Sequence, residues 1–250
     1  MAGAFSGIRI LDFTQGVAGP MATMLLADMD ADVLKVEPPG GDRMREHPGY
    51  LCWNRNKLIT TLDLASYDGL REARRLLAIA DAAVFDARPG ELERLGLDAS
   101  TLLRDHPRLL HVWMPPYGTE GRWSQLDHDE LLLSAVSGVA FMQMSFEEQP
   151  VALVTPQISY GHAVATANAI ASGLLERAQS GQGQAVRVSG LNGVARIETG
   201  GAVNAAGVIR MARGSLGGSP NYRPYQCAEG EWFFLGTLTM PFLIKALEAI

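Results

Sequence analysis

The stretch from residue 7 to residue 37 constrains the fold of this chain more than any other, because it reads as strand, loop, helix and strand in immediate succession. The apolar run at residues 8–11 predicts the first strand, and the run at residues 33–36 predicts the second. A unit of this length implies that the two strands pair in parallel. We therefore expect the loop at residues 14–19 at the carboxyl end of the first strand, where open α/β sheets bind ligands.

The helix of this unit is predicted over residues 20–29. Pro20 suits the first helical position, since its φ is already fixed and it has no amide hydrogen to leave unbonded. At helical spacing, four apolar side chains are expected to share one buried face, namely Met21, Met24, Leu25 and Met29.

A second unit of the same kind follows. Residues 57–64 and 82–85 are predicted to form strands, and Ser66 is predicted to cap a helix that runs to Ile79. One face of that helix carries Leu70, Ala73, Leu76 and Leu77. The tripeptide Arg88-Pro89-Gly90 comes directly after the second strand, so it should lie on the same side of the sheet as the first glycine loop.

Composition narrows the class of protein. The 250 residues are 47% hydrophobic and 19% charged, which is enough for an ordinary buried core. The net charge of −6, with no basic run, argues against a nucleic-acid partner. The two cysteines, Cys52 and Cys227, are too few and too far apart for a disulfide framework or a metal site. We expect them to be buried free thiols in a protein without a metal.

The chain carries no visible targeting signal. It does not open with a basic region followed by an apolar run. Residues 149–175 carry no formal charge, but Pro150, Pro156 and His162 interrupt them, so we predict a buried loop and helix rather than a membrane span. A cytoplasmic protein without membrane contact is expected.

Short motifs follow one another in a fixed order along the chain. They are Leu11-Asp12, Val17-Ala18-Gly19-Pro20, residues 31–37, Gly41-Asp42 with Arg45, Asn54-Arg55-Asn56-Lys57, Asp63-Leu64, Arg88-Pro89-Gly90, Leu95-Gly96-Leu97, Tyr117-Gly118 with Gly121, Asp129, Ser137-Gly138, residues 180–184, and residues 217–220 with Tyr222 and Tyr225. In these motifs the chain resembles the family III CoA-transferases, which include formyl-CoA and carnitine CoA-transferases and, as close relatives, the α-methylacyl-CoA racemases.

The resemblance implies an α/β fold with a Rossmann-like parallel sheet in a large domain, a smaller α+β domain, and two chains interlocked as rings. We assign residues 1–205 to the large, CoA-binding domain, residues 206–224 to a linker, and residues 225–250 to an incomplete beginning of the small domain. The partner implied is a second copy in a homodimer or a second homologous half.

The resemblance also implies the ligands, which are acyl-CoA as a substrate and a small carboxylic acid. The positions that match CoA-facing residues of the family are Val17, Ala18, Arg45, Arg55, Lys57, Arg88 and Gly90. Because CoA carries several phosphate charges, an acidic chain must supply local cations and backbone amides to hold them. For each basic residue taken alone, a solvated surface role is the alternative. Residues 38–56, rich in arginine, tryptophan and glycine, are predicted to be a binding loop.

A catalytic carboxylate is the feature in which the chain departs from the family. The transferases use an aspartate that attacks the acyl-CoA and passes through a mixed anhydride and an enzyme thioester. The matching position here is Ser159, and between residues 131 and 175 the only carboxylates are Glu147 and Glu148. A serine needs a base within hydrogen-bond reach, and His162, three residues on, is a weak candidate for that base.

His128 is the second catalytic candidate. It stands where the resemblance places a racemase histidine, one of the two bases needed on opposite faces of an acidic α-carbon. A structural role is the alternative, and the neighbouring Asp129 is expected to cap a helix. Three functions stay open: a CoA-transferase-like protein whose aspartate is missing, a racemase or isomerase built on His128, and a non-catalytic CoA-binding or structural half of a larger protein.

Overall fold

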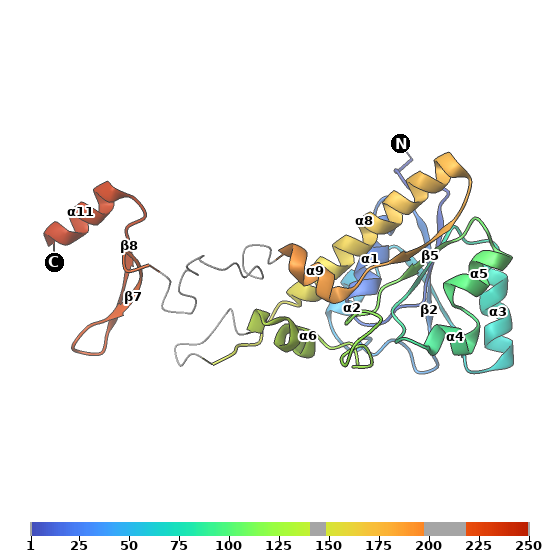
Figure 1. Ribbon diagram of the computed structural model, residues 1–250, viewed down its shortest axis with the longest axis horizontal. Helices are drawn as coiled ribbons and strands as arrows, with labels where there is room; N and C mark the ends of the chain where they lie inside the picture. Colours follow the sequence, from blue (N-terminus) through green and yellow to red (C-terminus); the bar gives the residue numbers. More distant parts are fainter. Residues whose placement is uncertain (1, 141–148, 198–218, 250) are drawn as a thin grey trace. The chain divides into compact units, whose positions relative to one another are not determined.

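The centre of the fold is a parallel sheet of six strands (Figure 1). The computed structural model describes residues 2–140, 149–197 and 219–249. The strands lie in the order β3-β2-β1-β4-β5-β6. Their bounds are β1 Arg9–Asp12, β2 Asp32–Glu37, β3 Lys57–Thr61, β4 Ala82–Phe85, β5 Leu110–Trp113 and β6 Gln184–Arg187. Successive strands are added outward in one direction from β1 to β3 and in the other direction from β4 to β6, so β1 and β4 flank the switch point of a doubly wound, Rossmann-like sheet.

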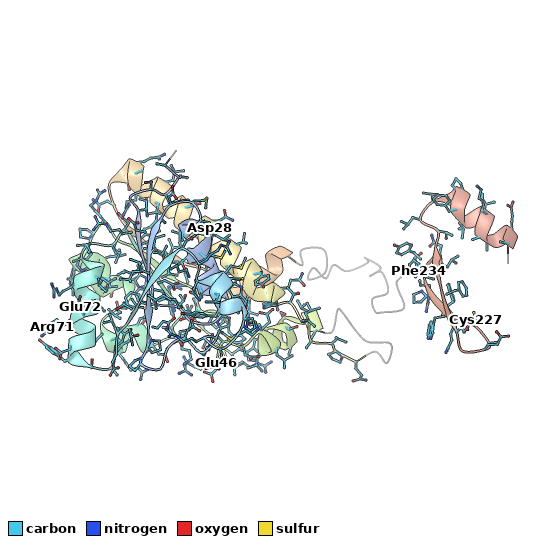
Figure 2. All side chains as sticks on the ribbon, turned by 180° about the vertical axis from the view of Figure 1, so that it is seen from behind. Asp28, Glu46, Arg71, Glu72, Cys227 and Phe234 are labelled. Carbon is cyan, nitrogen blue, oxygen red and sulfur yellow. The ribbon has the colours of Figure 1, made fainter. Side chains whose placement is uncertain are left out.

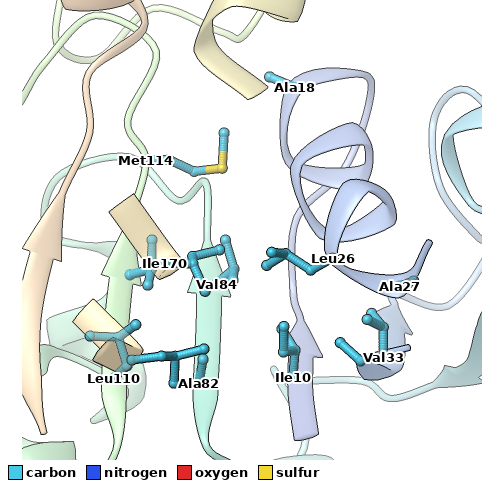
Figure 3. Packing of buried hydrophobic residues seen from close by; sticks show 13 residues of the cluster. Ile10, Ala18, Leu26, Ala27, Val33, Ala82, Val84, Leu110, Met114 and Ile170 are labelled. Carbon is cyan, nitrogen blue, oxygen red and sulfur yellow. The ribbon is translucent and has the colours of Figure 1, made fainter. Parts of the chain in front are cut away.

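Helices cover both faces of this sheet. On one face lie α1 (Ala18–Ala27) and α8 (Gln157–Ser180), and on the other lie α3 (Tyr67–Leu77), α4 (Glu91–Leu95) and α5 (Ala99–Asp105) (Figure 1). The first face is sealed by the side chains shown in Figure 3, among them Ile10 and Val84 of the sheet, Leu26 of α1 and Ile170 of α8. The sheet is therefore apolar on both sides, as parallel sheets are.

Helix α8 is fixed to the sheet at its far end. Arg177 pairs with Asp81 at 3.0 Å and donates to the carbonyl oxygens of Asp81 and Arg108. Asp81 directly precedes β4, so this contact lies at the amino edge of the sheet. One turn earlier, Gly173 lies against Leu110, and a Cβ at this glycine would come within 2.6 Å of the Leu110 side chain.

The bounds of β1 and α1 are close to those predicted, but the buried face of α1 differs from the prediction. Ser66 accepts a hydrogen bond from the amide of Gly69, which confirms the predicted cap of α3. In α1, Met29 lies beyond the last turn and is exposed, whereas Ala22 and Leu26 are buried. The expected methionine face was wrong because α1 packs under α8 as well as on the sheet, so it is buried nearly all round.

A second compact unit consists of residues 134–154 and 200–250. Its described part contains an antiparallel hairpin, β7 (Tyr222–Gln226) with β8 (Trp232–Gly236), and the helix α11 (Met240–Ala249). Much of the predicted linker at 206–224 lies outside the described residues, so the three domain ranges stay predictions.

Cys52 and Cys227, the latter labelled in Figure 2, are both exposed, so the expectation of buried thiols was wrong. Cys52 lies in the short helix α2 (Gly49–Trp53), and Cys227 directly follows β7. Within the described part of the chain, no helix is long and apolar enough to cross a membrane.

The contact of Gly173 with the sheet is testable. We expect Gly173→Val to lower the free energy of unfolding by about 1–3 kcal/mol, because the larger side chain must displace a fully buried leucine. Urea titration followed by circular dichroism measures the change. Ser172→Val is the matched control, since Ser172 precedes it on the same helix and is exposed. Equal effects of the two changes would contradict a tight contact at position 173.

Candidate active site

The carboxyl edge of the sheet holds a buried pair of opposite charges. Asp12, at the end of β1, is 3.0 Å from the ammonium of Lys57 at the start of β3, and both side chains have no exposed surface. Asp12 also accepts hydrogen bonds from Thr14 and from Thr23, the latter at 2.7 Å. Lys57 also donates to the Pro20 carbonyl at 2.6 Å. The pair therefore ties β1, the following loop, α1 and β3 together.

A second buried pair lies beside the first. Lys35 of β2 is 2.9 Å from Asp42 and donates to the carbonyl of Thr14 at 2.7 Å. Asp42 in turn accepts from the amide of Gly16 at 3.2 Å. Lys35 thus joins the loop at 14–19 to the start of the loop at 38–56.

The titration of these groups follows from burial and charge. Burial alone would raise the pKa of Asp12, but the charges of Lys57 and Lys35 and the two threonine hydroxyls hold that pKa well below its usual range. Burial lowers the pKa of Lys57 to about 8, although Asp12 opposes the shift. Lys35 behaves differently, because two carboxylates, Asp12 and Asp42, overcome burial and raise its pKa.

Glu37, at the end of β2, organises the remainder of the long loop. Its carboxylate is buried, pairs with Arg45, accepts from the hydroxyl of Tyr50 at 2.5 Å and from the amide of Asp42 at 3.2 Å. Burial and the hydrogen bond to Glu37 raise the pKa of Tyr50 to about 12. The loop at 38–56 is thus an ordered structure built on carboxylates at the strand ends.

The structure gives most of the predicted CoA-facing cations acidic partners within the chain. Arg45 pairs with Glu37, Arg55 with Asp28 and Arg88 with both Glu91 and Asp127, and each arginine side chain remains about half exposed. Lys57 differs from the expectation, because its ammonium is buried and bonded to three protein oxygens.

The backbone positions predicted to face CoA lie at two helix starts. Val17 directly precedes α1, and Ala18 is its first residue and is fully buried. Gly90 directly precedes α4 with a φ of 87°, a conformation that favours glycine. These positions follow β1 and β4, the two strands at the switch point.

Arg43 is a candidate that the sequence did not single out. It is exposed, and among the described residues no hydrogen bond or ion pair engages its guanidinium. It crosses Gly16 so closely that a Cβ at that glycine would lie 2.7 Å from the guanidinium. Its charge reaches Asp86, after β4, and His128. Nothing in the sequence distinguishes Arg43 from Arg45; only the pairing of Arg45 with Glu37 leaves Arg43 available.

His128 lies in a loop held on both sides. The hydroxyl of Tyr117 donates to the carbonyl of Asp127 at 3.2 Å and reaches that of Asp129 at 3.5 Å. The Nδ1 of His128 is buried and has no hydrogen-bond partner in the part of the chain that the structure describes. Burial, with Arg43 and His162 nearby, lowers the pKa of His128 to about 3, so its imidazole is neutral at ordinary pH.

His162 is a structural neighbour rather than a base for Ser159. Its Nε2 lies 2.9 Å from the carbonyl of Val188 and donates to it. Burial lowers the pKa of His162 to about 4. The hydroxyl of Ser159 is directed instead to the carboxylate of Glu130, at 2.6 Å. The expectation that His162 is only a weak partner of Ser159 agrees with this geometry.

Glu130 is the site residue that sequence reasoning missed. It begins α6 (Glu130–Ser137) and accepts hydrogen bonds from the amides of Ile158 and Ser159 at 2.9 and 3.0 Å. Glu130 directly precedes the stretch of residues 131–175 in which Glu147 and Glu148 are the only carboxylates. The contact between the start of α6 and the start of α8 is a tertiary contact, so no local sequence pattern predicts it.

Fold and site together define a doubly wound α/β protein with a polar site at the carboxyl ends of its strands. The sequence matches the profile of CoA-transferase family III over residues 5–250. The chain belongs to this family.

Individual relatives agree with the family assignment. The chain is 32% identical to a succinyl-CoA–D-citramalate CoA-transferase of Chloroflexus aurantiacus, over 97% of this chain and 64% of that protein. It is 28% identical to an alpha-methylacyl-CoA racemase of Mus musculus, over 98% and 64%. A crystal structure of a Mycobacterium tuberculosis protein shares 30% identity with a TM-score of 0.75, over 80% and 58%. The chain thus spans less than two thirds of the length of each.

The buried pair at the sheet edge predicts a large effect of one substitution. We expect Asp12→Asn to lower the free energy of unfolding by about 3–5 kcal/mol, because it leaves the ammonium of Lys57 buried without a countercharge. Asp28→Asn is the control, since it breaks the half-exposed pair with Arg55 and should change stability by about 1 kcal/mol or less. Thermal unfolding of both variants provides the comparison, and an Asp12 variant as stable as the control would refute the role of the pair.

Proposed function

We propose that the protein binds acyl-CoA at the carboxyl edge of its sheet and transfers CoA between carboxylic acids. One observation carries the proposal: the loops that follow β1, β2 and β4 meet around Arg43, an exposed guanidinium without an intramolecular partner in the described chain. Membership of CoA-transferase family III supports the chemical class of the ligand.

The charges of the site suit a phosphate-bearing ligand. CoA phosphates require donors that can be reached from solvent, and Arg43, Arg45 and Arg88 are exposed or half-exposed in the loops that follow β2 and β4. Arg55 stays a proposed contact, although it precedes β3 and pairs with Asp28 after α1, at the amino edge of the sheet. Lys57 supports the proposal indirectly, because its buried ammonium bonds to Asp12 and Pro20, which flank the loop at 14–19, rather than to the ligand. Val17, Ala18 and Gly90 stay proposed contacts through their backbone.

The acceptor in this proposal is a small carboxylic acid, and the family aspartate is replaced by Ser159. The proposal includes a cytoplasmic location and a partner, either a second copy in an interlocked homodimer or a homologous half. A non-catalytic CoA-binding or structural half is the alternative if acyl-CoA binds without reacting.

Binding of CoA tests the proposal directly. We expect isothermal titration calorimetry with CoA to give measurable heat, and Arg88→Ala to weaken binding by about 1–3 kcal/mol through loss of a charge-assisted contact. Arg75→Ala is the matched control, because Arg75 also forms an exposed pair with a glutamate three residues away.

Arg88 also ties its loop to the His128 loop through Asp127, so a second comparison separates the two roles. Asp127→Asn breaks the tie and keeps the guanidinium. Unchanged affinity in that variant supports direct contact with CoA. Absence of heat with the unaltered protein would refute the proposal.

A racemase or isomerase built on His128 is the second candidate. The buried, unpartnered Nδ1 of His128 favours it, because a neutral imidazole can accept a proton. We expect deuterium from D2O to enter the α-position of 2-methylbutanoyl-CoA, with loss of exchange in His128→Gln and no loss in the control His106→Gln.

The pH dependence of that exchange follows from the pKa of His128. Since the pKa lies at about 3, the basic form predominates above that value, and the exchange rate should stay level as pH falls from about 8 to about 5. A histidine with an ordinary pKa of about 6.5 would lose activity over the same range. Mass spectrometry of the recovered thioester measures the rate, and a decline centred near 6.5 would contradict the neutral, buried imidazole.

A further inference from the structure

A carboxylate lies where the family position lacks one. The Oε2 of Glu130 is 2.6 Å from the hydroxyl oxygen of Ser159 and 3.0 Å from the Ser159 amide nitrogen, and Oε1 is 2.9 Å from the amide nitrogen of Ile158. A carboxylate on the side chain of residue 159 itself would extend from the same Cβ as this hydroxyl. Glu130 therefore brings a carboxylate oxygen within one hydrogen bond of that point, from a different helix.

We propose that Glu130 is the catalytic nucleophile of this protein and replaces the aspartate that is absent at position 159. The inference rests on the proposed function, since it requires acyl-CoA to bind at the carboxyl edge of the sheet. It assigns the chemical step to a residue outside the helix that carries Ser159.

The hydrogen bonds leave one oxygen able to react. Oε2 accepts two hydrogen bonds from Ser159, whereas Oε1 accepts one from Ile158 and keeps a lone pair. Attack by Oε1 on the thioester carbonyl forms a C–O bond and breaks the C–S bond, which gives a mixed anhydride and the CoA thiolate. The thiolate then attacks the Glu130 carbonyl carbon, the anhydride C–O bond breaks, and the original acid leaves as a carboxylate.

The second half of the reaction restores Glu130. An acceptor carboxylate attacks the Glu130 thioester and releases the CoA thiolate, and a new mixed anhydride forms. The thiolate attacks the carbonyl carbon that came from the acceptor, so the acceptor leaves as its CoA thioester and Glu130 returns to a carboxylate. No proton, oxidant or reductant is consumed in the cycle.

Ser159 has a defined part in these steps. When the thiolate attacks the Glu130 carbonyl, negative charge develops on Oε2, and the amide and hydroxyl of Ser159 both donate to that atom. Donors fixed before the reaction stabilise such an oxyanion without reorganising. Ser159 thus acts as an oxyanion donor for Glu130 rather than as a nucleophile.

A purely structural role for Glu130 is the competing explanation. Pro156 at the start of α8 provides no side-chain cap, so Glu130 satisfies amides that would otherwise lack a partner. Two observations favour chemistry. Capping the helix requires acceptors only for backbone amides, yet the hydroxyl of Ser159 also donates to the Glu130 carboxylate. Two residues before Glu130, His128 has a buried Nδ1 that has no hydrogen-bond partner among the described residues, and His162 lies nearby.

The experiment traps the activated carboxylate in the unaltered protein. Incubation with acetyl-CoA or succinyl-CoA, followed by hydroxylamine, should convert Glu130 into its hydroxamate, which peptide mass spectrometry locates. Calorimetry on the same sample measures binding of CoA. Glu120→Gln, an exposed acid outside the site, should give the same yield as the unaltered protein.

Three variants sharpen the test. Glu130→Gln should give no hydroxamate, and Ser159→Ala should form it about 100- to 1,000-fold more slowly, the cost of losing one oxyanion donor. The double variant Glu130→Gln/Ser159→Asp tests whether the loss in Glu130→Gln is caused by misfolding. A hydroxamate at position 159 in the double variant excludes misfolding, because recovery of reactivity requires an intact site.

Each result has one meaning. A hydroxamate on Glu130 supports the inference. Binding of CoA without modification of Glu130 overturns the inference and leaves the proposed function standing. An acetyl ester on Ser159 has the same two consequences. Absence of CoA binding overturns the proposed function and this inference together.

Discussion

Two lysines buried beside carboxylates at the ends of adjacent strands are the constraint on which the remaining structure depends. Lys57 with Asp12, and Lys35 with Asp42, have no access to water, so each ammonium must keep its partner in place. These pairs span β1, β2 and β3 and the two loops between them. A change in the path of either loop would leave a buried charge without its countercharge, and the loops therefore share one geometry.

This constraint decides which charges remain for a ligand. Acidic residues engage the cations nearest the strand ends, and Glu37 engages Arg45 and Tyr50 in the same way. Arg43, on the same loop, has no hydrogen bond or ion pair among the described residues and crosses the glycine loop. The net charge of −6 is thus compatible with a local cationic site, because many carboxylates are spent on internal pairs.

Local sequence was sufficient for the framework and insufficient for the site. The first strand–helix–strand unit and the Ser66 cap follow from periodicity and turn chemistry, which act over a few residues. The buried face of α1 did not follow, since α8, more than a hundred residues later, covers it. The burial of Lys57 and the contact of Glu130 with Ser159 were missed for the same physical reason: each depends on a partner brought near only by the tertiary fold.

Helix α8 is fastened at both of its ends, at Ile158 and Ser159 by Glu130 and at Arg177 by Asp81. At about 1.5 Å per residue, its 24 residues form a rod of about 36 Å that runs from one edge of the sheet to the other. A stiff rod transmits a displacement along its axis with little loss. The position of Ser159 against the Glu130 carboxylate, at the carboxyl edge of the sheet, therefore also depends on the ion pair of Arg177 with Asp81 at the amino edge.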